Sequence, residues 1–225
     1  MLVETGVSAE TVHVIHSGAD VRSFEQANRS LERSRLGYSD AEVVFCYIGS
    51  FRYFHGLDDV IEAARQAASS SALARFLMVG DGPRRAEVEQ QVRQAGLADQ
   101  FHFTGAVAHE RIPALLAASD VCLSVYPTGQ RMYFCPLKLL EYLAAGKAVL
   151  ASRVGVQEEI LTHGEDAWLV PLGDVAALSQ AMLHLAGQSA LRELLGRQAV
   201  RLVREQLTWE HVVERIERLL TLPAP

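Results

Sequence analysis

The chain has 225 residues, of which 49% are hydrophobic and 21% charged, and its formal net charge is −6. This balance is typical of a globular domain and excludes general disorder. The acidic excess argues against a nucleic-acid-binding surface, which usually carries a basic excess. Cys46, Cys122 and Cys135 show neither a pairing pattern nor metal-ligand spacing, so a reducing, cytoplasmic location is expected. Neither a signal-peptide pattern nor a membrane-spanning apolar run is visible, and peripheral membrane contact stays open.

Buried strand patterns and amphipathic helix patterns alternate along the chain. The expected strands are residues 43–48, 76–79, 101–104, 121–125, 148–152 and 167–170. The expected helices are residues 58–68, 84–95, 112–118, 137–145, 158–162, 175–187, 190–205 and 209–220. Residues 12–20 are interpreted as a strand and a turn, and the polar residues 25–40 as a loop. Strands separated by helices of this length predict an α/β fold with a doubly wound parallel sheet, whose ligands bind at the carboxyl ends of the strands.

Residues 136–147 carry the clearest functional signal. They predict a loop that opens into an apolar helix, since Pro136 suits the first helical position and Gly146 the position after the last. Free N–H groups around Leu137 and Lys138 would attract a phosphate. Glu141 lies about one turn further and suits the hydroxyl groups of a ribose. The alternative is a buried helix in which Lys138 and Glu141 pair with each other.

This stretch resembles the donor-binding motif of the retaining GT-B glycosyltransferases of family 4, also called group 1, in a bacterial variant with a Pro-Leu-Lys-Leu core. In that family, two glutamates lie eight positions apart, the first near the transferred sugar and the second on the nucleotide ribose. Glu141 matches the second glutamate. Tyr133 stands at the position of the first, and its hydroxyl could hydrogen-bond a sugar but carries no charge at neutral pH.

A second candidate segment follows the first expected strand. Gly49 and Gly56 allow close backbone approach, and Ser50, Arg52 and His55 lie between them. The family usually has an arginine here and a lysine directly before the second glycine, both on the donor diphosphate. Arg52 matches the arginine and His55 replaces the lysine, so His55 is expected to contact phosphate as an imidazolium whose binding weakens as the pH rises. The alternative is an ordinary turn in which Arg52 is solvated and His55 caps a helix.

Turns after the next two strands are also candidates. Gly80 and Gly82 lack the third glycine of a dinucleotide fingerprint, but the family has this turn near its donor site, where glycines let backbones pack closely. Val107 matches the place where relatives contact the nucleobase. Metal-ligand spacing is absent, so neither a metal nor a cofactor is expected. Isolated surface positions are expected for His102, His109, His163, His184 and His211.

The resemblance covers nearly the whole chain but only the second half of a two-domain enzyme. It assigns residues 1–24 to the end of a missing N-terminal acceptor domain, residues 25–207 to a Rossmann-like nucleotide-sugar-binding domain, and residues 208–225 to a helix that crosses back. It implies hexosyl transfer with retention in polysaccharide or glycolipid biosynthesis, with Arg52, His55 and Glu141 as catalytic residues. The acceptor domain would come from the missing region or from a separate chain, and transfer is not expected without it.

Two alternatives remain at this point. The chain could be a non-catalytic nucleotide-sugar-binding subunit of a split glycosyltransferase. It could also be an unrelated Rossmann-type protein such as an oxidoreductase, which the broken glycine fingerprint disfavours.

Overall fold

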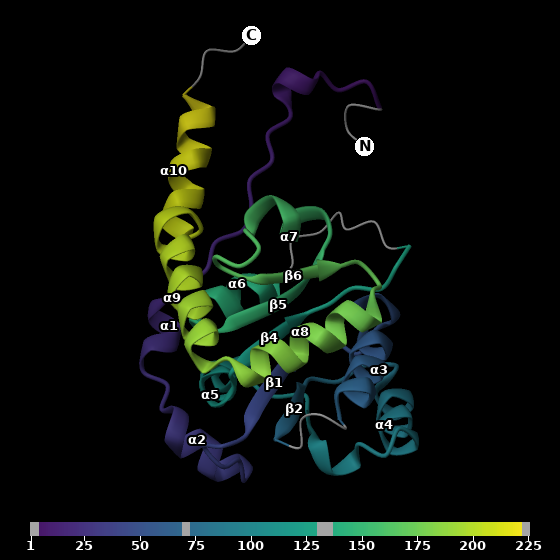
Figure 1. The fold of residues 1–225 in the computed structure, drawn as a ribbon. Helices are drawn as coiled ribbons and strands as arrows, with labels where there is room; N and C mark the ends of the chain where they lie inside the picture. The colour runs from purple at the N-terminus through teal and green to yellow at the C-terminus, as the bar shows by residue number, and fades with distance from the viewer. Residues whose placement is uncertain (1–4, 69–72, 130–136, 222–225) are drawn as a thin grey trace.

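The computed structural model describes residues 5–68, 73–129 and 137–221 as a six-stranded sheet with helices on both faces (Figure 1). All strand pairs are parallel, and the order β3-β2-β1-β4-β5-β6 is that of a Rossmann sheet. The strands are β1 (Val43–Ile48), β2 (Ala74–Val79), β3 (Phe101–Gly105), β4 (Val121–Ser124), β5 (Ala148–Arg153) and β6 (Trp168–Pro171). The α-helices are α1 (Arg22–Glu25), α2 (Arg29–Leu36), α3 (Leu57–Ala67), α4 (Arg85–Gln94), α5 (Ile112–Ala118), α6 (Leu137–Ala144), α7 (Gly155–Ile160), α8 (Val175–Gly187), α9 (Ser189–Gln206) and α10 (Trp209–Leu220). Short 3-10 helices are η2 (Ala9–Thr11), η3 (Tyr53–His55), η4 (Ala98–Gln100) and η5 (His109–Arg111).

The predicted doubly wound parallel sheet is confirmed, and each strand and helix predicted after residue 42 is present with ends shifted by at most a few residues. β1 lies inside the sheet and is buried along its whole length, as expected of a parallel strand covered on both faces. Phe45 and Tyr47 face the core under α3 and α8, whereas Cys46 and Ile48 face the core under α5, α6 and α9. Cys46 and Cys122 are buried free thiols in adjacent strands, as predicted for strand cysteines.

The prediction of a loop over residues 25–40 is wrong, because this segment contains α2. Asn28 caps the helix by accepting a hydrogen bond from Leu31 N at 3.0 Å, and Gly37 ends it with a φ of 76°. The buried residues of α2 are Glu32 and Arg33. The helix therefore lacks the apolar stripe from which a sequence pattern is recognised.

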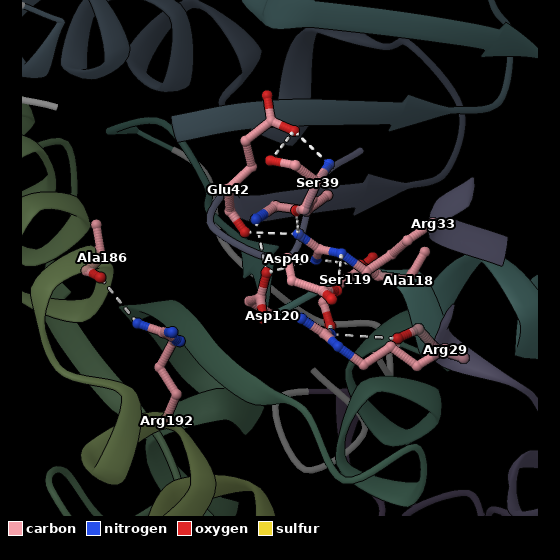
Figure 2. Close-up of polar contacts among 12 residues, drawn as sticks. Arg29, Arg33, Ser39, Asp40, Glu42, Ala118, Ser119, Asp120, Ala186 and Arg192 are labelled. Carbon is pink, nitrogen blue, oxygen red and sulfur yellow. Dashed lines mark hydrogen bonds and ion pairs between the residues drawn. The ribbon is translucent and has the colours of Figure 1, made fainter. Parts of the chain in front are cut away.

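Arg33 fastens α2 to the amino end of the sheet (Figure 2). Its side chain is 1% exposed and donates to Ala118 O at 3.0 Å, Asp120 Oδ2 at 3.1 Å and Glu42 O at 2.6 Å. Arg29 donates to Asp120 Oδ1 at 2.7 Å. Glu42 and Asp120 directly precede β1 and β4, so this polar cluster lies at the opposite edge of the sheet from the predicted ligand site.

The two ends of the folded unit meet beside α9. Residues 12–18 form no strand, so that prediction is wrong. Instead, Ala19 forms an isolated parallel β-bridge with Thr208, and Ala19 N donates a hydrogen bond to Leu207 O at 2.8 Å. The N-terminal tract and α10 then extend past the same end of the molecule (Figure 1). Within the described ranges, none of the helices is both long and apolar enough to cross a membrane.

Candidate functional site

Backbone hydrogen bonds join the loops at the carboxyl ends of β1, β2 and β3. Gly49 N donates to Val79 O at 3.0 Å, and Gly80 N donates to Gly105 O at 2.9 Å. Gly80 has a φ of 123°, and an added Cβ would overlap the carbonyl oxygen of Gly49. At Gly82, an added Cβ would lie 2.6 Å from Phe51 N. The glycines therefore provide the close backbone packing that the sequence predicted for this turn.

Arg84 holds the loop between β1 and α3, which contains η3, against these turns. Arg84 is 3% exposed and forms ion pairs with Asp58 at 2.7 Å and Glu87 at 2.6 Å. Its guanidinium group lies 4.5 Å from the centre of the Tyr53 ring, a cation–π contact. These contacts fix the loop that carries Arg52 and His55 relative to α3 and α4. Arg52 itself is exposed on this loop.

Buried contacts position the N-terminus of α6 beside the end of β1. The hydroxyl of Tyr142 accepts a hydrogen bond from Ile48 N at 2.7 Å, and Leu139 and Leu143 are fully buried in the core under this helix. Leu137 is exposed at the first position of α6. The helix N-terminus and the loop after β1 therefore lie at one edge of the sheet, as the motif predicted.

Lys138 and His55 are in direct contact, although they come from different segments. Lys138 Nζ lies 3.0 Å from His55 Nδ1 and 4.3 Å from the centre of the Tyr47 ring. The other ring nitrogen of His55 lies 3.3 Å from Ser50 Oγ. When Lys138 is an ammonium group it can only donate, so His55 then accepts at Nδ1 and carries its proton on Nε2, facing Ser50.

Burial is the main cause of the pKa shifts of both groups. Burial, together with the nearby Lys138 and Arg52 cations, lowers the pKa of His55 to about 3. Burial lowers the pKa of Lys138 to about 7. In the unliganded chain His55 is therefore a neutral imidazole at neutral pH, in place of the imidazolium expected from the sequence, and Lys138 is the group that titrates.

Glu141 lies one turn further along α6, at the wall of a cavity of about 430 Å³. Its side chain is 26% exposed, and burial raises the pKa of the carboxyl group. His109 Nε2 lies 3.9 Å from Glu141 Oε1, while no hydrogen bond reaches this carboxylate from the described residues. The cavity is also lined by Asp20, Phe24, Glu110, Ile112, Leu140 and Trp209.

These positions exclude the alternative in which Lys138 and Glu141 pair with each other, because Lys138 contacts His55 and Glu141 faces His109. Val107, the predicted nucleobase contact, is half-buried against the core on the α5 and α6 side. Tyr133 lies outside the described residues, so its predicted sugar contact stays a prediction.

Sequence reasoning missed several groups of this site. His109 is 81% exposed, as expected for a surface histidine, yet it faces Glu141. Tyr47 lies beneath Lys138, and Trp209 comes from the other end of the chain to line the cavity. A local pattern gives no signal for such groups, because each depends on a contact between distant segments.

Residues 42–188 match the family described as "Glycosyl transferases group 1". The chain belongs to this family. The chain is 26% identical over 208 residues to the N-acetyl-alpha-D-glucosaminyl L-malate synthase of Bacillus anthracis, a match that covers 92% of the chain and 53% of the relative. It is 30% identical over 206 residues to the 2-deoxystreptamine N-acetyl-D-glucosaminyltransferase of Streptomyces fradiae, covering 91% and 47%. The chain thus spans about half the length of the curated relatives it matches.

Solved structures identify which half this is. The C-terminal domain of a group 1 glycosyltransferase, LpcC of Francisella tularensis, superposes on this chain with a TM-score of 0.73 and 25% identity, covering 85% of the chain and 99% of that domain. HepE of Anabaena, solved in complex with UDP, gives a TM-score of 0.86 at 22% identity and covers 97% of the chain and 60% of HepE. The fold is that of the C-terminal half of a GT-B glycosyltransferase, which removes the oxidoreductase alternative.

Proposed function

We propose that this glycosyltransferase domain binds a nucleoside diphosphate sugar at the carboxyl edge of its sheet. The observation that carries the proposal is the cavity beside the N-terminus of α6, in which Glu141 presents a carboxylate that accepts no hydrogen bond from the described residues. A volume of about 430 Å³ suits a small organic ligand. Ribose hydroxyl groups donate well to such a carboxylate, and phosphate would lie toward Lys138 at the helix terminus. HepE, which has the same fold, binds UDP in its solved structure.

The roles in transfer follow from charge. As the sugar leaves, negative charge develops on the diphosphate, where Arg52 and the N-terminus of α6 would stabilise it. Glu141 would orient the ribose and so align the donor. The resemblance to retaining enzymes implies that the configuration at the sugar is retained. The acceptor and the groups that bind it belong to the other half of the enzyme.

The exposed face of α10 supports the proposal that another half of the enzyme packs there. No described residue of α10 is buried, and Trp209, Val213, Ile216 and Leu220 share one face with between 41% and 80% of their surface exposed. Such a contiguous apolar face is typical of an interaction site. Since the chain spans half of its relatives, we assign this face to the acceptor domain, in the same polypeptide or in a separate subunit.

A ligand panel tests the donor site. The chain is titrated with UDP, GDP, ADP and NAD in thermal-shift and calorimetric experiments, and at least one of the three nucleoside diphosphates should bind while NAD does not. Sugar transfer by the chain alone should be absent, because transfer needs donor and acceptor to be aligned. Binding of NAD alone, or of none of the four, would overturn the donor-site assignment.

A further inference from the structure

His55 stands directly before Gly56 in the loop after β1. The ammonium group of Lys138 lies 3.0 Å from the His55 ring, so α6 supplies a cation beside this loop. His55 is 7% exposed, and both of its ring nitrogens already have partners. A direct phosphate contact by this imidazole would break one of those hydrogen bonds. Lys138, by contrast, still has two N–H donors for a ligand.

We propose, building on the proposed donor site, that Lys138 and His55 act as one unit: Lys138 supplies the charge that holds the donor diphosphate, and neutral His55 positions its ammonium group by accepting its hydrogen bond. Lys138 then binds the ligand directly, and His55 is a positioning residue. The Tyr47 ring fixes the ammonium group from the side of β1, 4.3 Å away.

The surrounding groups explain why the pair needs an anion. The titratable and charged neighbours are Tyr47 on β1, Arg52 on the loop, Tyr126 after β4, whose ring lies 6.1 Å from that of His55, and Glu141 on α6. Burial alone accounts for the lowered pKa of Lys138, to about 7. The described surroundings therefore provide no anion close enough to offset the desolvation of the ammonium group. A bound diphosphate would provide it.

The sign of the pH dependence follows from this. A diphosphate raises the pKa of Lys138, so binding is linked to proton uptake wherever the free chain is deprotonated. Below about pH 7 the free amine already carries its proton, and affinity is highest. Above that pH, affinity falls until the pKa of the complex is reached. With a free pKa of about 7, the loss between pH 6.5 and 8.5 is roughly 20-fold.

Calorimetry on four variants tests this unit. The probe is UDP, GDP or ADP, whichever binds in the ligand panel, and the corresponding nucleoside is the control. Titrations at pH 8 in buffers of different ionisation enthalpy count the protons taken up. The parent should take up close to one proton with the diphosphate and none with the nucleoside. Lys138→Met should abolish the uptake, weaken diphosphate binding at pH 6.5 by at least about 10-fold, and leave the nucleoside affinity unchanged.

The remaining variants separate charge from position. His55→Gln keeps an acceptor and should retain most of the affinity, while His55→Leu should lose it and change the pH profile. The double variant His55→Lys, Lys138→Met should recover diphosphate binding relative to Lys138→Met, because it places a cation on the loop. A Lys138→Met variant with unchanged affinity and proton uptake would overturn the inference while leaving the donor site intact. Absence of binding by any diphosphate to the parent would instead overturn the donor site itself.

Discussion

Replacing Glu141 by Gln tests the ribose contact, because it removes the charge and keeps the shape of the side chain. In the free chain the carboxyl group is mostly buried, and its pKa is raised by that burial. An acid whose pKa is higher in the folded than in the unfolded state stabilises the fold less as the pH rises through that pKa. The nearby His109 is 81% exposed and offers little compensation. The unliganded variant should therefore melt at or slightly above the temperature of the parent.

Ligand binding should change in the opposite direction. A hydrogen bond from a ribose hydroxyl contributes about 1.5–3 kcal/mol when the acceptor is a carboxylate, and about 0.5–1.5 kcal/mol when it is the neutral amide oxygen that Gln keeps. Glu141→Gln should therefore raise the Kd for the nucleotide by roughly 5- to 12-fold. The assay is calorimetry with the bound nucleoside diphosphate and its 2′,3′-dideoxy analogue. The parent should discriminate between the two ligands, and the variant should discriminate less.

The dideoxy analogue makes the test specific. If Glu141→Gln lowers the affinity for both ligands by the same factor, the carboxylate does not contact the ribose hydroxyl groups. A lower melting temperature of the unliganded variant would also refute the reasoning, because it would show that the carboxylate stabilises the fold.

Three further predictions concern the scaffold. Gly80→Ala should destabilise the domain by about 3 kcal/mol or more in chemical denaturation, because the added Cβ would overlap backbone atoms at a positive φ. The control Gly96→Ala, at a φ of 72° with open space around it, should cost only about 1–2 kcal/mol. Equal losses of stability in the two variants would contradict this prediction. Arg33→Met removes a hydrogen-bond donor from Asp120 and from three carbonyl groups, and should lower the free energy of unfolding by about 3–5 kcal/mol. An unchanged melting temperature would show that the buried cluster is not needed for stability. Changing Val213 and Ile216 together to Glu should reduce self-association of the isolated chain, as measured by light scattering. The melting temperature should not fall, because both side chains are exposed on α10. A loss of stability in this double variant would show that the face packs inside this domain.

The sequence was sufficient wherever structure follows from local chemistry. Continuous apolar runs such as Val43–Ile48 predicted the strands, and the Pro136–Gly146 pair framed a helix whose described residues form α6. The pattern failed at α2, because its buried face consists of Glu32 and Arg33 and reads as polar. A hydrophobic stripe is the usual signal of a packed helix, and here ion pairs replace it.

The site shows the same division. Glycine positions and the helix terminus were predictable because each imposes its own backbone geometry. The protonation of His55 was not, because it depends on burial and on Lys138, a residue 83 positions away that approaches only after β1 and α6 pack together. An isolated histidine suggests a pKa near 6.5, and only the neighbour reveals which member of the pair carries the proton at neutral pH.

The bridge between Ala19 and Thr208 has a practical consequence for protein engineering. The polypeptide enters and leaves the sheet domain at the same place. There Gly18 packs closely on Trp209, and a Cβ added to Gly18 would lie 2.6 Å from the backbone nitrogen of Trp209. Two cuts at this point, with Gly18 retained, would excise the unit as a cassette. Grafted onto the acceptor half of another group 1 enzyme, the cassette should carry its own choice of sugar nucleotide with it, so that chimeras become a route to new combinations of donor and acceptor.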